Sequence, residues 1–262
     1  MKIYKVTISF ICILAIAFFF TGCKKATKNG KNIICFVDFS DSKNTSSRLD
    51  FYKEVIHKSI LINLNMYDRL IILPIDKSSV TNSTEIFFVD MSKKSFYPEM
   101  ASPLEEEKIV KENIKRELDS LSVVFSRNFD LAKQGRVSPS LGTDIFGALE
   151  VGKREIVSGE DNVIVLLSDM MNWSEELKME PQNNTFNDKT WEQLLTKVTQ
   201  VKLEDSKIVV ITGEVVDASP EHYKLIQKFW SKYFEVNNAI LYDYNSASTS
   251  KLNELMALPV NE

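Results

Sequence analysis

Short runs rich in isoleucine and valine alternate with longer segments of helical periodicity along most of this 262-residue chain. This alternation is typical of a parallel sheet covered by helices, because the connection between two parallel strands has to cross the sheet. Six runs are expected to form strands: 32–38, 69–75, 85–90, 162–169, 207–213 and 239–244. The first, fourth and fifth runs are almost continuously apolar, as expected for central strands that are buried on both faces.

The connection between the second and third runs is only nine residues long, at 76–84. Such a connection is too short for a crossover helix, so we expect these two strands to pair in antiparallel fashion. The predicted fold is therefore one α/β domain. Its central sheet is doubly wound and mostly parallel, with one antiparallel edge strand and helices on both faces.

The clearest helix is expected to begin at Ser102, where Pro103 in the first turn and Glu105 three residues after Ser102 form the pattern of a capping box. Apolar residues then recur every three or four positions and should face the sheet: Val110, Ile114, Leu118, Leu121 and Phe125. Further helices are expected over 47–64, 145–157, 190–201 and 220–234.

The first 22 residues have the pattern of a secretory signal. Lys2 and Lys5 precede an apolar run at 6–20, and FTGC follows at 20–23. The sequence before Cys23 resembles the lipobox of bacterial lipoproteins, which implies that 1–22 is removed and that Cys23 is lipidated. An uncleaved membrane anchor is the alternative, although the apolar run is shorter than the roughly 20 residues of a spanning helix.

Residues 23–31 have no apolar periodicity and are expected to form a flexible basic tether. Its lysines either lie against anionic lipid head groups or are simply solvated. The resemblance to lipoproteins implies a lipid-anchored protein of the bacterial cell envelope. Lys24 after Cys23 resembles lipoproteins sent to the outer membrane rather than kept at the inner one, and the domain is expected to face the periplasm.

Charge and cysteine content exclude several other classes of protein. The first 31 residues contain six lysines and no acidic residue, so the formal net charge of −4 for the whole chain becomes −10 for the rest. An acidic body argues against nucleic acid as a partner. Of the three cysteines only Cys35 lies in the body, so neither a disulfide framework nor a cysteine zinc site is expected.

Oxygen-bearing side chains crowd the end of the first strand, in FVDFSDS at 36–42. Alternate residues of an extended segment point the same way, so Asp38, Ser40 and Ser42 should converge at the carboxyl edge of the sheet. Open α/β sheets bind their ligands at that edge. One carboxylate and two hydroxyls form half of an oxygen-only shell, which suits Mg²⁺ or another small hard cation.

Two other segments offer further ligands, namely Thr143 before a predicted helix and Asp169 at the end of the fourth strand. Together the three segments resemble the metal-ion-dependent adhesion site (MIDAS) of the von Willebrand factor type A (vWA) domain, and the resemblance runs from 32 to about 244. It implies a vWA-like domain over 32–262 that holds Mg²⁺, Mn²⁺ or Ca²⁺ through Asp38, Ser40, Ser42, Thr143 and Asp169. The family often has glycine where this chain has Asp41 and Met170. For each hydroxyl alone, helix capping or turn formation stays an open alternative.

The resemblance also implies how the protein works. In the family, an Asp or Glu of a protein partner completes the coordination of the ion, so we expect a membrane-tethered interaction module that is not an enzyme. Two alternatives are a metal-free structural lipoprotein and a Mg²⁺-dependent phosphoryl or ester hydrolase that uses Asp38 and Asp169. The sequence contains neither a G-x-S-x-G elbow nor a phosphate-binding glycine loop, so no motif supports the hydrolase.

Large apolar residues follow Asp169 in the segment MMNW at 170–173. Met170, Met171 and Trp173 are candidates for a patch that faces the partner. The alternative is that Trp173 and one methionine pack under the following loop.

Overall fold

The structure is a computed structural model that describes residues 30–40, 45–99, 102–136, 142–179, 185–213 and 219–257. The predicted signal segment and most of the tether, including Cys23, lie outside these residues, as do Asp41 and Ser42.

Six strands form a single sheet in the order β3-β2-β1-β4-β5-β6. They are β1 (Lys31–Asp38), β2 (Arg69–Ile75), β3 (Phe87–Asp90), β4 (Asp161–Leu167), β5 (Lys207–Ile211) and β6 (Ile240–Asn245). Neighbours pair in parallel except β2 and β3, which are antiparallel. The predicted fold class is confirmed, and so is the antiparallel edge. The strand order reverses between β1 and β4, which is the point where doubly wound sheets bind ligands.

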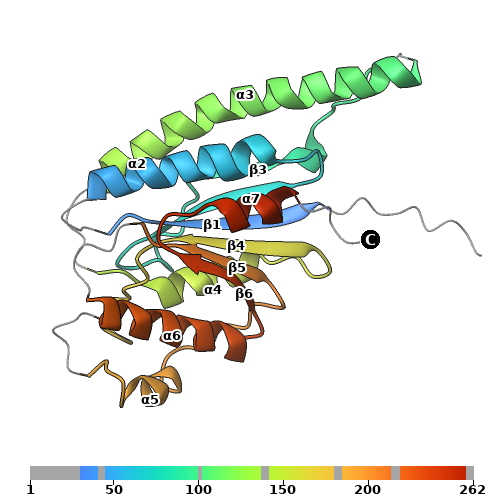
Figure 1. The fold of residues 1–262 in the computed structure, drawn as a ribbon. Coiled ribbons are helices and arrows are strands. Elements are labelled where there is room, and N and C mark those ends of the chain that lie inside the picture. The colour runs from blue at the N-terminus through green and yellow to red at the C-terminus, as the bar shows by residue number, and fades with distance from the viewer. Residues whose placement is uncertain are drawn as a thin grey trace, which may run out of the picture.

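Helices cover both faces of the sheet (Figure 1). One face carries α2 (Thr45–Val55), α3 (Pro103–Arg136) and α7 (Ser250–Ala257), and the other carries α4 (Ile145–Glu155), α5 (Trp191–Leu195) and α6 (Pro220–Val236). Each face has its own apolar core. Alternate residues of β1 divide between the two cores, with Ile33, Cys35 and Val37 on the α2/α3 side and Ile34 and Phe36 on the other.

The helix predicted from Ser102 is confirmed as α3, and it runs past Phe125 to Arg136. The Ser102 backbone N–H donates to Glu105 Oε2 at 3.2 Å, which is one of the two bonds of a capping box. Val110, Leu118, Leu121 and Phe125 are buried and Ile114 packs against the same core, as their spacing predicted.

Two other helix predictions differ from the structure. The segment predicted over 47–64 is α-helical only to Val55 and continues as a π-helical turn at Ile56–Ile60 and a 3₁₀ turn at Leu61–Asn63. The helix predicted over 190–201 shortens to α5, and α7 was not predicted. A second 3₁₀ turn, Met91–Lys93, follows β3, where the Asp90 carboxylate accepts from Ser92 N.

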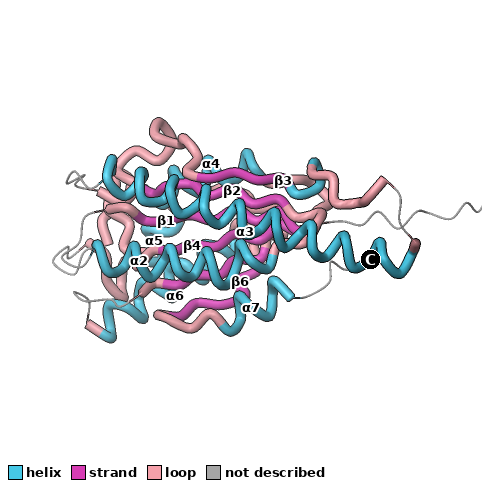
Figure 2. The backbone as a smooth tube through the Cα atoms, turned by 90° about the horizontal axis from the view of Figure 1, so that it is seen from above, coloured by secondary structure: helices cyan, strands magenta, loops and turns pink. Residues whose placement is uncertain are grey.

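The parallel strands give the sheet two different edges. β1 begins at Lys31 at the amino edge and ends at Asp38 at the carboxyl edge, next to the end of β4. Figure 2 shows the sheet from above, with α3 crossing it and extending beyond it at one end. The amino edge therefore receives the chain from the N-terminal segment, and the carboxyl edge carries the loops of the candidate site.

Candidate functional site

Asp38 forms the base of the candidate site at the carboxyl edge. Its side chain is fully buried, and each of its oxygens accepts a hydrogen bond. Oδ1 accepts from Ser40 N at 2.8 Å, and Oδ2 accepts from Ser168 Oγ at 2.7 Å. Ser168 follows β4 directly, and the register that pairs Val37 with Leu167 places it beside Asp38.

Arg48, from α2, reaches into the same site and joins its two sides. Its Nη1 lies 3.1 Å from Asp169 Oδ2, and its Nη2 donates to the Ser40 carbonyl oxygen at 3.2 Å. The other Asp169 oxygen, Oδ1, accepts from Met171 N at 3.0 Å. The side chains of Arg48 and Asp169 are only 7% and 13% exposed, so the ion pair is largely shielded from water.

The electrostatics follow from two carboxylates that share one guanidinium. Burial and the negative charge of Asp38 raise the pKa of Asp169 to about 6, against the opposing effect of Arg48. Burial acts to lower the pKa of Arg48, but the charges of Asp38 and Asp169 outweigh it and the pKa is raised. Arg48 is therefore a permanent cation at this edge.

Thr143 belongs to the same edge through backbone contacts with the loop after β4. Its N–H donates to the Trp173 carbonyl oxygen at 3.0 Å, and Trp173 N–H donates to the Thr143 carbonyl oxygen at 2.8 Å. Asn172 reinforces this link, because its Oδ1 accepts from Ile145 N at 2.9 Å at the start of α4. The structure thus brings Asp38, Ser40, Thr143 and Asp169 to one edge. Ser42, the fifth predicted ligand, lies outside the described residues.

The sequence reasoning missed three residues of this site: Arg48, Ser168 and Asn172. Ser168 and Asn172 are fully buried polar residues, and each ties two segments together. A signal existed for Ser168, since it is the first polar residue after the apolar run VIVLL at 163–167. Nothing local marks Arg48, because its partner Asp169 is 121 residues away.

The apolar patch predicted after Asp169 is only partly available to a partner. Met170 is fully buried in the core below the sheet, so its assignment to a partner-facing surface is corrected. Met171 packs against the same core and is half-buried. Trp173 is also half-buried, and the Lys178 ammonium lies over its ring, 5.8 Å from the ring centroid, in a cation–π contact.

The carboxylates of the candidate site are engaged by protein partners in this structure. All four oxygens of Asp38 and Asp169 already accept hydrogen bonds, and a guanidinium neutralises part of their charge. Within the described part of the chain no three or more His, Cys, Asp or Glu side chains gather in a metal-binding group. The predicted set depends mainly on hydroxyls and includes Ser42, so the ion stays an untested prediction.

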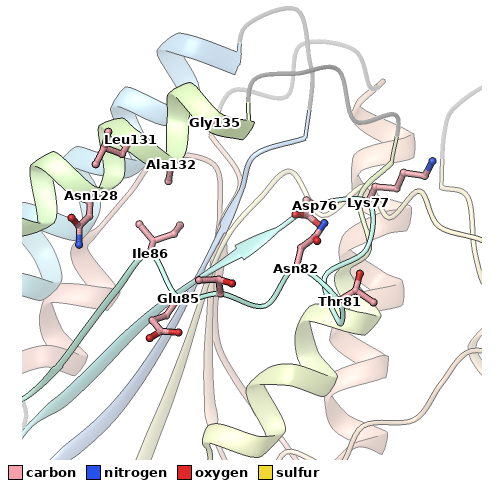
Figure 3. Close-up of a pocket in the computed structure, with 11 residues that line it drawn as sticks. Asp76, Lys77, Thr81, Asn82, Glu85, Ile86, Asn128, Leu131, Ala132 and Gly135 are labelled. Atoms are coloured by element: carbon pink, nitrogen blue, oxygen red, sulfur yellow. The ribbon is translucent and has the colours of Figure 1, made fainter.

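A hollow of about 750 Å³ lies beside the site, between the end of α3 and the connection from β2 to β3. Figure 3 shows Ile86 on one side of this hollow and Leu131 and Ala132 of α3 on the other. Asp76 and Lys77 line its rim, and Ser79 Oγ ties the same connection to the Asp144 carbonyl oxygen at 2.8 Å. The hollow therefore borders the loop that carries Thr143.

The order of the strands and the helices on both faces define a doubly wound, mostly parallel α/β fold. Among solved structures, the chain is similar to the conserved hypothetical protein BatB from Bacteroides thetaiotaomicron, with 13% sequence identity, a TM-score of 0.45, and coverage of 87% of this chain and 96% of that chain. It is also similar to a von Willebrand factor type A protein from Catenulispora acidiphila, with 11% identity, a TM-score of 0.39, and coverage of 87% and 41%.

A third similar structure is an aerotolerance-related membrane protein from Bacteroides fragilis NCTC 9343, with 14% identity, a TM-score of 0.38, and coverage of 87% of this chain and 95% of that chain. No protein family and no curated protein matches the sequence. The contacts of this chain alone therefore carry the functional proposal.

Proposed function

We propose that this chain is a membrane-tethered protein-interaction module of vWA-like fold that binds its partner at the carboxyl edge of the sheet. The observation that carries the proposal is the convergence of separate loops on the Asp38–Arg48–Asp169 cluster at that edge. Buried charges are costly to keep in a fold that does not use them. Loops placed by a rigid sheet are the usual carriers of binding residues.

The membrane part of the proposal comes from the N-terminal pattern. Lipidation of Cys23, removal of 1–22 and a tether over 23–31 would hold the domain in the bacterial cell envelope, at the outer membrane and facing the periplasm. None of the helices in the described residues is long and apolar enough to cross a bilayer.

The metal-dependent form of the proposal assigns Mg²⁺, Mn²⁺ or Ca²⁺ to Asp38, Ser40, Ser42, Thr143 and Asp169. Such an ion would supply an electrophilic centre for an Asp or Glu of the partner. This form requires Arg48 to leave Asp169, because the guanidinium and the ion would compete for the same carboxylate.

The hydrolase is less well supported by the geometry. In that hydrolase Asp38 and Asp169 would hold Mg²⁺, whereas Asp169 is paired with Arg48 and both Asp38 oxygens accept hydrogen bonds inside the protein. The structural-lipoprotein alternative agrees with an ion pair that needs no metal, but it gives no role to the loops at the edge.

Photocrosslinking in cells of the source organism tests the binding surface. A photoreactive amino acid replaces Trp173 or Lys77 at the carboxyl edge, and the matched control replaces Glu160, an exposed residue just before β4 at the amino edge. We expect the same discrete adduct from both carboxyl-edge positions and none from the control. Adducts from Glu160 alone, or from no position, would contradict the proposal.

A further inference from the structure

We infer that the guanidinium of Arg48 is the built-in cation of the carboxyl-edge site and that it takes the place of a divalent ion. The inference deepens the proposed function and rests on it in one respect, since it names the cation of the same binding edge. It also has a consequence of its own, because it makes the site independent of metal.

The position of Arg48 is fixed at both ends of its side chain. At the head, Nη1 meets Asp169 Oδ2 at 3.1 Å and Nη2 donates to the Ser40 carbonyl oxygen at 3.2 Å, so the planar fork spans the loops after β1 and β4. Along the stem, Arg48 Cγ lies close to Gly213, which follows β5. A Cβ added to Gly213 would lie 3.5 Å from Arg48 Cγ. Gly213 has a φ of +69°, a conformation that favours glycine.

The hydroxyl of Tyr52 lies beside Gly213 as well, 3.5 Å from the same ideal Cβ. Tyr52 is fully buried one turn further along α2, and its hydroxyl donates to the Thr212 carbonyl oxygen at 2.9 Å. The ends of two strands bind the guanidinium and the side chain is only 7% exposed, so Arg48 is part of the fold and not a mobile surface arginine. One cost remains, because Arg48 Nε is buried without a hydrogen-bond partner among the described residues.

The charges explain why Arg48 and a divalent ion exclude one another. Asp38 and Asp169 supply two negative charges, and Arg48 neutralises one of them within hydrogen-bond distance. A Mg²⁺ ion binds carboxylate oxygens at about 2.0–2.1 Å. An ion at Asp169 would therefore face a guanidinium only a few ångströms away, in a site with little water to screen the repulsion.

The inference predicts how the wild-type chain responds to metal. The full chain in detergent is titrated with Mn²⁺, followed by calorimetry and by the paramagnetic resonance signal of free Mn²⁺. We expect no site with a dissociation constant below about 1 mM, the weak end of known Ca²⁺ sites. A site tighter than this in the wild type that Asp38→Asn removes would overturn the inference.

The variant Arg48→Met tests the same point from the other side, because it keeps the length of the stem and removes the charge. We expect Arg48→Met to unfold at a lower temperature than the wild type. Added Mn²⁺ should restore part of the lost unfolding temperature in Arg48→Met and none of it in the double variant Arg48→Met/Asp38→Asn. The matched control is Arg154→Met, since Arg154 is an exposed arginine on α4 paired with Glu150. An equal Mn²⁺ response in wild type and Arg48→Met would contradict the inference.

Should Arg48→Met fail to fold, the wild-type titration decides the question alone. The metal measurements need no partner, so they are separate from the crosslinking test. Crosslinks that form at the carboxyl edge but vanish in a chelator would overturn the Arg48 inference and leave the proposed binding surface intact. Crosslinks that are absent at the carboxyl edge, together with a metal-free wild type, would overturn only the proposed function.

Discussion

At the scale of single residues, Met170 shows how the site is held in shape. Its φ of +63° lies in the left-handed region, which is strained for a residue with a side chain. Two bonds hold it, from Met170 N to Ser168 Oγ at 3.0 Å and from Trp230 Nε1 to the Met170 carbonyl oxygen at 2.8 Å. The buried side chain and these bonds offset the strain.

Met170→Gly is accordingly expected to destabilise the protein despite relieving the backbone. Loss of a fully buried methionine side chain costs about 2–5 kcal/mol, and relief of the left-handed conformation returns about 1–2 kcal/mol. Urea unfolding measures the net change, with Met170→Leu as the control that keeps the volume and costs less than about 1.5 kcal/mol. A glycine variant as stable as the wild type would show that the side chain contributes little.

Asp68, at the amino edge, gives a pH dependence that is separate from the candidate site. Burial raises its pKa above the ordinary value of 3.8, against hydrogen bonds from Asn65 N and Lys31 N, each at 2.8 Å. The folded protein therefore holds this proton to a higher pH than the unfolded chain does. The contribution of Asp68 to stability is largest at low pH and falls as pH rises from 3.8 through the raised pKa.

Asp68→Asn removes this titration. Free energies of unfolding measured between about pH 3.5 and 7 should then show the stability of the wild type decreasing relative to the variant as pH rises. The difference between the two curves is the quantity to follow, because Asn also loses a hydrogen-bond acceptor at all pH values. A difference that grows in favour of the wild type as pH rises would reverse the assigned sign.

At the scale of elements, close packing of β1 against the helices limits what each position tolerates. Gly152 of α4 faces Phe36 of β1, and a Cβ there would lie 2.6 Å from Phe36 Cζ. Phe36 is fully buried, so its ring has little room to move.

Gly152→Ala is expected to destabilise the protein by about 1–3 kcal/mol through overpacking, even though alanine favours the helix. Gly135→Ala is the matched control on α3, because nothing lies within 4 Å of its added Cβ. The control should gain about 0.5–1 kcal/mol from helix propensity. Thermal unfolding of both variants tests the contrast, and a stabilised Gly152→Ala would show that the β1–α4 contact is loose.

Cys35 in β1 gives a second prediction at the scale of elements. It is buried with no exposed surface, and burial raises the pKa of its thiol far above the ordinary value. Because the thiolate is the reactive form, iodoacetamide should label Cys35 slowly in the native chain and rapidly in urea. Mass spectrometry of the peptide that contains Cys35 measures both rates and distinguishes it from Cys12 and Cys23. Rapid native labelling would indicate that β1 opens locally.

The elements that sequence could predict are those whose signal is local. Apolar runs gave all six strands, and the spacing of Val110 to Phe125 gave the buried face of α3. The π-helical turn after Val55 and the short α7 carry weak local signals, so tertiary packing decides them. Asp38 and Ser40 were placed by strand-end reasoning, whereas Arg48 depends on a contact 121 residues away and was invisible to it.

At the scale of the whole molecule, the parallel sheet places the start of β1 and the candidate site at opposite edges. Residues before β1 enter at the amino edge, while Asp38, Thr143 and Asp169 stand at the carboxyl edge. The chain in Figure 1 follows this polarity, with the blue strand β1 running from one edge to the other. The segment 24–30, between Cys23 and β1, can span only about 20–25 Å even when fully extended.

This polarity fixes what a lipid on Cys23 would mean for the molecule. The amino edge would then lie near the bilayer, and the Arg48 cluster would lie at the opposite edge of the sheet. Such a tether would keep the amino edge close to the lipid and leave the candidate site at the edge of the domain farthest from the attachment point.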